Sequence, residues 1–258
     1  MLSLSKKIVC ITGASSGIGA ACASEFAKLG CDLLLTARRK ERLDDLAQTI
    51  TSKYGSRVHA VTLDVTDREK VERVFSSLPQ EWREIGILVN NAGLARGLAK
   101  LYEGKIQDWE EMIDTNIKGL LYVTRAVLPG MVERNRGHVI NIGSIAGHQT
   151  YPMGNVYAAS KFAVTALTRG LKMDLLGTAV RVSSVDPGLV QTEFSLVRFR
   201  GDSERAAKTY AGMTALQATD IAETVVFCAT RPAHVNIHEV TMMPTEQASV
   251  GLVHRKNA

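Results

Sequence analysis

The chain has 258 residues, and 45% of them are hydrophobic, which is enough for one sizeable core and predicts a single domain. Its 31 lysine and arginine residues exceed its 26 acidic residues, for a formal net charge of +5 that suits an anionic ligand. The basic residues form no dense run, so the charge does not indicate a nucleic-acid-binding protein.

The cysteines and the apolar segments predict a location in the cytoplasm. The four cysteines, Cys10, Cys22, Cys31 and Cys228, have no C-x-x-C spacing, and as reduced thiols they would act as small hydrophobic side chains. The segment before Gly13 has too short an apolar run for the core of a secretory leader, and no stretch approaches the roughly 18 apolar residues of a membrane span. We therefore expect no membrane partner.

The first predicted element is a buried strand, Ile8–Thr12, which ends in a glycine-rich turn. Apolar residues then recur at helical spacing over Gly17–Leu29. The turn has the spacing G-x-x-x-G-x-G from Gly13 to Gly19, in which glycines let the backbone approach a pyrophosphate and the helix N-terminus offers free N–H groups. By itself, such a turn is a weak signal, and a purely structural turn is the more common explanation.

The second predicted strand, Leu33–Thr36, leads into Ala37, Arg38 and Arg39. In a dinucleotide-binding fold this position meets the adenosine ribose, where a carboxylate binds the 2′-hydroxyl and arginines pair with a 2′-phosphate. The nearest carboxylate here is Glu41, so the two arginines predict NADP(H). The alternative is that they are solvated residues at the start of a polar helix.

Further strands alternate with helices, which predicts an α/β fold: a Rossmann-type, doubly wound parallel sheet of about seven strands in a three-layer αβα domain. The later strands are predicted at Val58–Leu63, Gly86–Val89, Val139–Ile142, Val180–Val185 and Glu239–Met242. They are followed by Asp64 and Val65, by Asn91, Ala92 and Gly93, by Ser144, and by Pro187 and Gly188. These residues would share the carboxyl edge of the sheet, where such folds bind ligands.

Two long helices are predicted at Gln107–Glu133 and Val156–Leu176. Asn116 lies inside the first, where asparagine is unfavourable unless its side chain is exposed or bonds a buried group. In the second, Tyr157 and Lys161 are spaced i, i+4, which puts the ammonium one turn from the phenol. A neighbouring cation favours phenolate, so we expect Lys161 to lower the tyrosine pKa from about 10 towards neutrality and make it a usable acid and base.

Ser144 lies on the loop before the second helix, from which its hydroxyl can hydrogen-bond the same substrate oxygen as the phenol. It does not fit a hydrolase, because the nucleophile elbow G-x-S-x-G requires glycines where Ile142 and Ala146 stand. His234 and His238 are four residues apart but lie in a strand-like run without further ligands, so no metal site is predicted.

The last quarter of the chain is less regular. Periodicity fails from Leu189, and the segment 189–215 follows the carboxyl end of a strand, where a lid over a ligand would lie. We therefore expect one NADP-binding domain over residues 1–258 with a substrate lid at about 189–215. A helix over Ala218–Ala229 and a polar tail over Thr245–Ala258 complete the prediction.

The motifs TGASSGIG, LDV, NNAG, YAASK and PG-x-x-x-T, with Asn116 in its helix and Ser144, together resemble those of the short-chain dehydrogenase/reductase family over nearly the whole chain. The resemblance implies a catalytic tetrad of Asn116, Ser144, Tyr157 and Lys161, in which Asn116 keeps a water-linked proton path to the lysine. The cofactor-binding residues it implies are Gly13, Ser15, Ser16, Gly17, Ile18, Gly19, Arg38, Arg39, Asp64, Val65, Asn91, Ala92, Gly93, Tyr157, Lys161, Pro187, Gly188, Val190 and Thr192.

The segments NNAGLARGL, NIGSIAGHQTYP, DPGLVQTEFS and VTMMPTEQ resemble more narrowly the NADP-dependent 3-hydroxy acid dehydrogenases, the group that includes serine 3-dehydrogenase. This implies oxidation of a small acid such as serine, allo-threonine or 3-hydroxyisobutyrate, held by Ser144 and Tyr157. A substrate carboxylate needs a cationic or amide partner. The candidates are Arg96, Gln149, His148, Arg198 and Arg200.

Two alternatives to this function stay open: a broad-range NADPH-dependent carbonyl reductase for ketones, sugars or steroids, and a catalytically silent NADP-binding protein. We also expect a homotetramer, because both long helices carry apolar residues on more than one face and the resemblance places them at a dimer interface.

Overall fold

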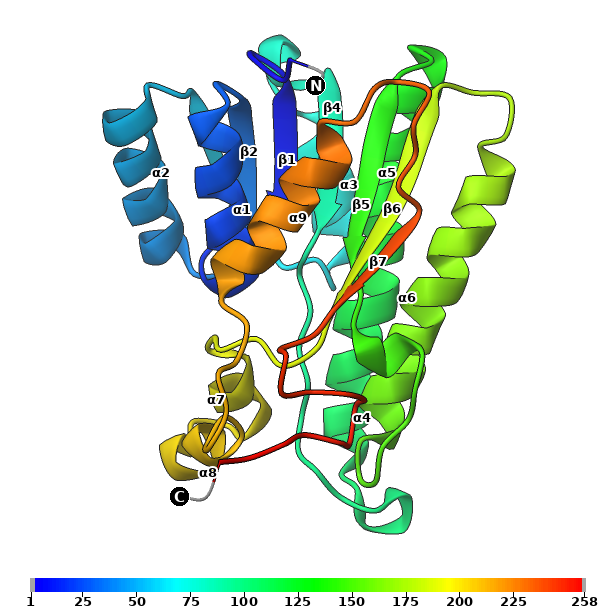
Figure 1. Ribbon diagram of the computed structural model, residues 1–258. Helices are drawn as coiled ribbons and strands as arrows, with labels where there is room; N and C mark the ends of the chain where they lie inside the picture. Colours follow the sequence, from blue (N-terminus) through cyan, green and yellow to red (C-terminus); the bar gives the residue numbers. More distant parts are fainter. Residues whose placement is uncertain (1–2, 257–258) are drawn as a thin grey trace.

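The computed structural model describes residues 3–256 and contains a seven-stranded parallel sheet with helices on both faces (Figure 1). The strand order is β3-β2-β1-β4-β5-β6-β7, so the chain builds outward from β1 in one direction and then from β4 in the other. The strands are β1 Ile8–Thr12, β2 Asp32–Ala37, β3 Val58–Thr62, β4 Ile85–Asn90, β5 Gly137–Ile142, β6 Val180–Pro187 and β7 Glu239–Met242. The predicted doubly wound fold is confirmed, with its switch point between β1 and β4.

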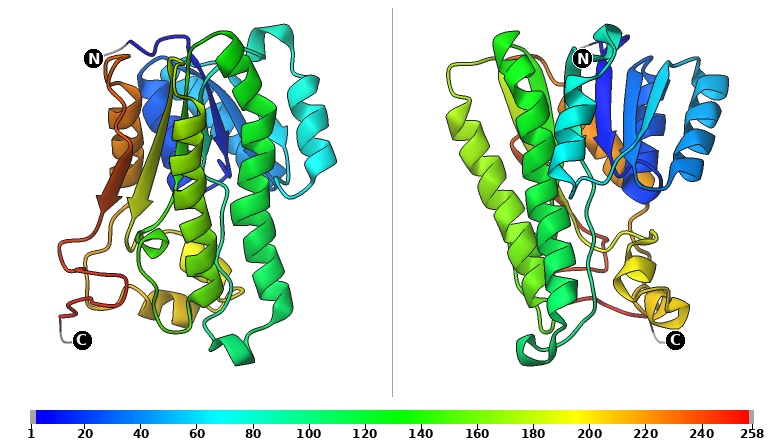
Figure 2. Two further views of the ribbon diagram at one scale, coloured as in Figure 1. Left: turned by 90° about the vertical axis from the view of Figure 1, so that its right-hand side faces the viewer. Right: turned by 180° about the vertical axis from the view of Figure 1, so that it is seen from behind.

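Helices α1, α2 and α9 cover one face of the sheet, and α3, α5 and α6 cover the other (Figure 2). Their bounds are α1 Gly17–Lys28, α2 Lys40–Tyr54, α3 Arg68–Ser76, α5 Leu120–Glu133, α6 Asn155–Asp174 and α9 Ala218–Ala229, and short 3-10 turns span Gln80–Trp82, Leu101–Glu103 and Ile145–Gly147. Along β1, Val9 and Ile11 pack into the first layer and Cys10 into the second. Because helices bury both faces, the central strands are apolar at almost every position.

All four cysteines are free and buried, as predicted for small hydrophobic side chains. Burial raises the pKa of Cys22 and Cys31 to about 12 and that of Cys228 to about 11, so these thiols stay protonated. None of the described helices has the length and apolarity needed to cross a membrane.

The long helix predicted over Gln107–Glu133 is interrupted by a π turn. Helix α4 spans Ile106–Ile113, the π turn spans Asp114–Gly119, and α5 follows directly. Asn116 lies in the π turn, where its Oδ1 accepts a hydrogen bond from Leu94 N (2.8 Å) and its Nδ2 donates to Leu94 O (2.9 Å) and Ser160 Oγ (2.9 Å). Of the two roles open to this asparagine, bonding a buried group is the one observed, and the local π geometry is typical of functional positions in helices.

The segment after β6 contains two short helices, α7 Phe194–Arg198 and α8 Ser203–Lys208, at the carboxyl edge of the sheet (Figure 1). The described part of the predicted polar tail packs against this segment. Gln247 is buried and accepts a hydrogen bond from Leu189 N (2.8 Å), and Lys256 N donates to Gly212 O (2.7 Å). The tail therefore holds the irregular segment in place by bonding its backbone; its final residues, 257–258, lie outside the described part.

Candidate active site

The turn between β1 and α1 leaves no room for a side chain at Gly13 or Gly19. Gly13 and Gly17 adopt positive φ angles of 66° and 53°, and a Cβ on Gly19 would lie 2.5 Å from Asn91 Nδ2. Ser16, the N-cap of α1, makes no side-chain capping bond, so the first N–H groups of the helix have no partner from that side chain. A close-fitting backbone cradle at a helix N-terminus is suited to a pyrophosphate.

Next to this cradle lies a cluster of guanidinium groups and hydroxyls. Arg39 donates from Nε to Ser15 Oγ (3.2 Å) and from Nη1 to Glu193 Oε2 (2.8 Å), and Arg42 donates to Glu193 Oε1 (2.6 Å). The two arginines hold the pKa of the Glu193 carboxyl below its usual value. The donor set suits a 2′-phosphate, but Glu193 takes up part of the capacity of Arg39.

Ser144, Tyr157 and Lys161 come together where β5 ends and α6 begins, and they line one cavity with the glycine turn. Ser144 Oγ accepts a hydrogen bond from Ala146 N (3.1 Å) and donates to Pro187 O (3.5 Å), and Lys161 Nζ donates to the carbonyl oxygen of Ile142 (2.9 Å). All three predicted side chains are buried. The structure thus brings a phenol, a hydroxyl and an ammonium to one end of the cavity.

Asn116 reaches the same end from the π turn. Gly93, in the turn after β4, is the common neighbour: a methyl group there would lie 3.3 Å from Asn116 Oδ1 and 3.7 Å from Lys161 Nζ. The four residues of the expected tetrad are therefore grouped around the end of the cavity, with Asn116 on the side of Lys161.

The electrostatics of Tyr157 differ from the expectation. Burial raises its pKa, and the charge of Arg198 and the hydrogen bond with Ser144 oppose that rise. Lys161 is not the cation that acts on the phenol here, because its ammonium is directed to the backbone of Ile142. Burial also lowers the pKa of Lys161 to about 8, against the opposing charge of Asp186.

Arg198, at the end of α7, lies over the phenol ring. Its guanidinium carbon is 5.0 Å from the ring centre of Tyr157 and 5.4 Å from that of Phe194, and Nη2 donates to Tyr151 Oη (2.7 Å). Its Nε is buried without a hydrogen-bond partner among the described residues. No carboxylate of residues 3–256 forms an ion pair with it, which leaves a partly buried cation facing the cavity.

The other proposed carboxylate partners lie elsewhere. Arg96 is paired with Glu111 at 2.5 Å and lines a neighbouring cavity rather than the one with Ser144. Arg200 pairs with Asp108 and Glu111, and Gln149 is exposed and accepts a hydrogen bond from the tail. Arg96 and Gln149 are therefore not brought to the phenol, because partners from α4 and the tail occupy them.

Most of the residues that the family resemblance assigned to the cofactor line the cavity. Those that line it are Gly13, Ser16, Gly17, Ile18, Asn91, Ala92, Gly93, Tyr157, Lys161, Pro187, Gly188, Val190 and Thr192. Those outside its lining are Ser15, Gly19, Arg38, Arg39, Asp64 and Val65. Asp64 accepts hydrogen bonds from Thr66 and lies 3.9 Å from Arg38, which ties the carboxyl end of β3 to that of β2.

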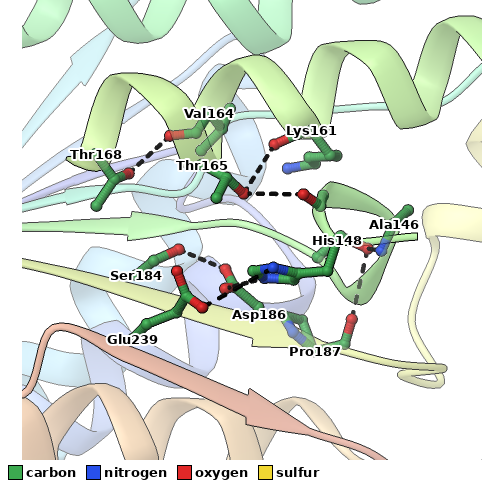
Figure 3. Close-up of polar contacts among 12 residues, drawn as sticks. Ala146, His148, Lys161, Val164, Thr165, Thr168, Ser184, Asp186, Pro187 and Glu239 are labelled. Carbon is green, nitrogen blue, oxygen red and sulfur yellow. Dashed lines mark hydrogen bonds and ion pairs between the residues drawn. The ribbon is translucent and has the colours of Figure 1, made fainter. Parts of the chain in front are cut away.

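Sequence reasoning missed the residues that shape the substrate side of the cavity. Tyr151 and Phe194 place aromatic rings against Arg198. A further missed residue, Asp186, lies outside the lining of the cavity and hydrogen-bonds His148 (Figure 3). The position of Phe194 within the predicted lid could have indicated that it lies near the substrate. Asp186 precedes the Pro187–Gly188 motif, but nothing in the local sequence indicates its partner, which lies 38 residues earlier.

A model of the family described as short chain dehydrogenase matches residues 7–201 of the chain. The NADP-dependent 3-hydroxy acid dehydrogenase YdfG of Salmonella typhi is 54% identical over 250 residues, which cover 96% of this chain and 99% of the relative. Sulfoacetaldehyde reductase 2 of Chromohalobacter salexigens is 48% identical over 242 residues, 93% of this chain and 95% of the relative. A closed form of serine dehydrogenase complexed with NADP+ superimposes with a TM-score of 0.90 at 50% identity, covering 96% of this chain and 100% of that one.

Proposed function

Because the chain belongs to the short chain dehydrogenase family, we propose that it transfers a hydride between NADP(H) and the 3-hydroxyl or 3-keto carbon of a small hydroxy acid. At the coarser level it is an NADP-dependent oxidoreductase that acts on CH–OH groups. The names of its relatives support serine, allo-threonine or 3-hydroxyisobutyrate as the finer substrate class.

The cofactor end of the cavity fits NADP(H) on its own geometry. The glycine cradle would hold the pyrophosphate at the N-terminus of α1, and Arg38 and Arg39, with Ser15, would hold the 2′-phosphate. Pro187, Gly188 and the residues up to Thr192 would line the nicotinamide side. The bound nicotinamide supplies the hydride chemistry, and the protein orients it and stabilises charge on the substrate oxygen.

Tyr157 is the proposed acid and base. Its Oη takes the proton of the substrate hydroxyl during oxidation and returns a proton to the oxygen during reduction, while Ser144 Oγ holds that oxygen. Because burial raises the pKa of Tyr157, the phenol keeps its proton at neutral pH and is ready to act as the acid of reduction. Lys161 would hold the nicotinamide ribose, and the placement of Asn116 beside it supports the water-linked proton path.

The position and charge of Arg198 are the main support for a substrate that contains a carboxylate. Arg198 is a partly buried cation without a carboxylate partner among the described residues, and it lies against the ring of Tyr157. A substrate carboxylate would supply the missing counter-charge while its hydroxyl met Tyr157 and Ser144. We therefore propose Arg198, in place of Arg96 and Gln149, as the residue that binds the substrate carboxylate. The segment 189–215 remains the proposed lid.

The test compares a 3-hydroxy acid with its methyl ester in an assay of NADP+ reduction. We expect the ester, which lacks the charge, to have a KM at least about tenfold higher, equivalent to ~1.4 kcal/mol. Equal KM values would favour the second candidate, a broad-range carbonyl reductase. That candidate is supported by the apolar side chains of Phe194 and Val197 next to Tyr157.

The assembly and location are also part of the proposal. The exposed apolar side chains of Leu121 on α5 and Phe162 on α6 support a homotetramer built through these two helices. The free, buried cysteines support a location in the cytoplasm. Light scattering at micromolar concentration checks the assembly, and a monomeric mass would reject it.

A further inference from the structure

A cluster of polar side chains that the proposed mechanism does not use lies where β6 ends, outside the lining of the cavity (Figure 3). Its centre is Asp186 at the end of β6, whose side chain is 0% exposed. Asp186 Oδ2 shares a hydrogen bond with His148 Nε2 (2.7 Å), and Ser184 Oγ donates to Asp186 Oδ1. On its other side, His148 Nδ1 lies 3.9 Å from Glu239 Oε1. His148 thus joins a fully buried carboxylate to a partly exposed one.

Asp186 and Lys161 contact two consecutive residues of one backbone segment. Lys161 Nζ donates to Ile142 O (2.9 Å), and the next residue, Gly143, packs so closely against the Asp186 carboxylate that a Cβ there would clash. Asp186 is the group of opposite charge that acts on Lys161.

The loop that carries His148 is fixed to the helix that carries Lys161. Thr165 Oγ1 lies 3.3 Å from Gly147 O and 3.2 Å from Lys161 O, so it bridges the loop and α6 (Figure 3). A Cβ on Gly147 would lie 2.7 Å from Thr165 Oγ1, which keeps the two elements in close contact. The arrangement of His148, Asp186 and Lys161 is therefore set by packing.

A metal ion is the other ligand that this cluster suggests, because His148, Asp186 and Glu239 offer donor atoms within 4.8 Å of one another. The two ring nitrogens of His148, however, face different carboxylates, and Nε2 already bonds Asp186. A metal site needs one ring nitrogen and both carboxylates to converge on a single point. The geometry favours a hydrogen bond between His148 and Asp186, with Glu239 nearby, over a metal site.

We infer that Asp186 and His148 are positioning residues: the buried Asp186 carboxylate, held by His148, keeps Lys161 in its ammonium form for cofactor binding. The inference rests on the proposed function, in which that ammonium contacts the nicotinamide ribose. The charged groups that surround Asp186 are His148 on its loop, Glu239 on β7, Lys161 on α6 and, through Glu239 at 3.2 Å, Arg169 on α6.

The sign of the effect follows from burial. Burial lowers the pKa of Lys161 to about 8, and the Asp186 charge opposes this, so loss of that charge makes Lys161 lose its proton at lower pH. Burial raises the pKa of Asp186, and the hydrogen bonds from Ser184 and His148 oppose that rise. Removing the His148 hydrogen bond frees the Asp186 carboxylate from its place against Gly143, and this weakens its effect on Lys161 in the same direction.

The test is the affinity for NADPH, measured by fluorescence titration between about pH 6 and 10, a readout independent of turnover. In the unmodified protein we expect affinity to fall as pH rises through about 8, and Lys161→Met should lack this transition. Asp186→Asn keeps the shape and hydrogen-bonding capacity of the side chain, and it should move the transition down by about one pH unit. Thermal melting checks that each variant is folded.

Two variants of His148 separate its hydrogen bond from mere packing. His148→Gln keeps an N–H donor for Asp186 and should stay near the unmodified profile, whereas His148→Leu should shift the transition in the direction of Asp186→Asn. Glu239 lies near Asp186 only through His148, so Glu239→Gln should shift the pH of the transition less than Asp186→Asn does. Equal shifts for the two His148 variants would overturn the role assigned to the histidine.

The failures are distinguishable. If the unmodified protein bound no NADPH, the proposed function itself would fail. If it bound NADPH with a transition that Lys161→Met removes and Asp186→Asn leaves in place, this inference alone would be overturned.

Discussion

The charged groups at the two ends of the cavity differ in their exposure to solvent. At the cofactor end, the side chains of Arg39 and Glu193 are 42% and 39% exposed, whereas at the chemical end Lys161 is 7% exposed and Asp186 is 0% exposed. Exposed pairs are screened by water and salt and typically contribute ~0–1 kcal/mol, while buried charges shift pKa values by whole units. The exposed end therefore tunes which cofactor binds and how tightly, and the buried end sets which protonation states react.

The largest effect is expected from the buried end. Tyr157→Phe removes only the hydroxyl that exchanges the proton, and proton transfer by a positioned group typically contributes about 10²–10⁴-fold. We expect kcat to fall by at least about a hundredfold while the NADPH Kd stays nearly unchanged. Steady-state kinetics and fluorescence titration measure the two quantities. A variant that retained more than a few per cent of kcat would remove Tyr157 from the role of acid and base.

Substitutions at the cofactor end are expected to change the preference between NADPH and NADH rather than the turnover rate. Replacing Ala37 with Asp and neutralising Arg38 and Arg39 exchanges a phosphate site for a ribose acceptor. Charge-assisted bonds of this kind contribute roughly 1.5–3 kcal/mol each, and the exposure of both arginines places them at the low end. We expect kcat/KM for NADPH to fall at least tenfold and that for NADH to rise.

The same comparison has a simple control, the unmodified protein assayed with both cofactors. Preference for NADPH is expected. Equal efficiency with NADH would mean that the two arginines do not read the 2′-phosphate.

Arg198 lies over the Tyr157 ring at the chemical end; it is partly buried and has no carboxylate partner among residues 3–256. Arg198→Met keeps the apolar stem over Tyr157 and removes the charge, so KM for a 3-hydroxy acid should rise about tenfold while KM for its methyl ester changes little. Arg200→Met is the matched control, because Arg200 is paired with Asp108 and Glu111. Equal effects on acid and ester would assign Arg198 to packing alone.

The fold and the nearness of Tyr157 to Lys161 could be predicted because their signals are local, whereas Asn116 joined the expected tetrad only through the family resemblance. The alternation of apolar runs with helical periodicity fixes the parallel sheet, and Tyr157 and Lys161 are neighbours on one helix turn. Which arginine faces the substrate could not be predicted, because it depends on where Glu111 lies in space: this carboxylate neutralises Arg96 and Arg200. The same holds for charges joined only by the fold, such as Asp186 with His148.

Glu193 is a third such case, and it offers the smallest and sharpest test of the exposed end. Its carboxylate accepts hydrogen bonds from Arg39 and Arg42, and it follows Thr192, which lines the cavity. A 2′-phosphate would have to take Arg39 from this carboxylate. Glu193 would thus compete with the 2′-phosphate of the cofactor for Arg39.

Glu193→Gln keeps the size of the side chain but weakens this competition. Because an exposed pair contributes roughly 0.2–1 kcal/mol, we expect the Kd for NADPH to fall by about 1.4- to 5-fold and the Kd for NADH to stay unchanged. The gain should shrink at high salt, since salt screens the competing charges. Glu204→Gln, which disrupts only an exposed pair with Lys208 on α8, serves as the control. Weaker NADPH binding by the Glu193 variant would instead mean that the carboxylate holds Arg39 in place for the phosphate.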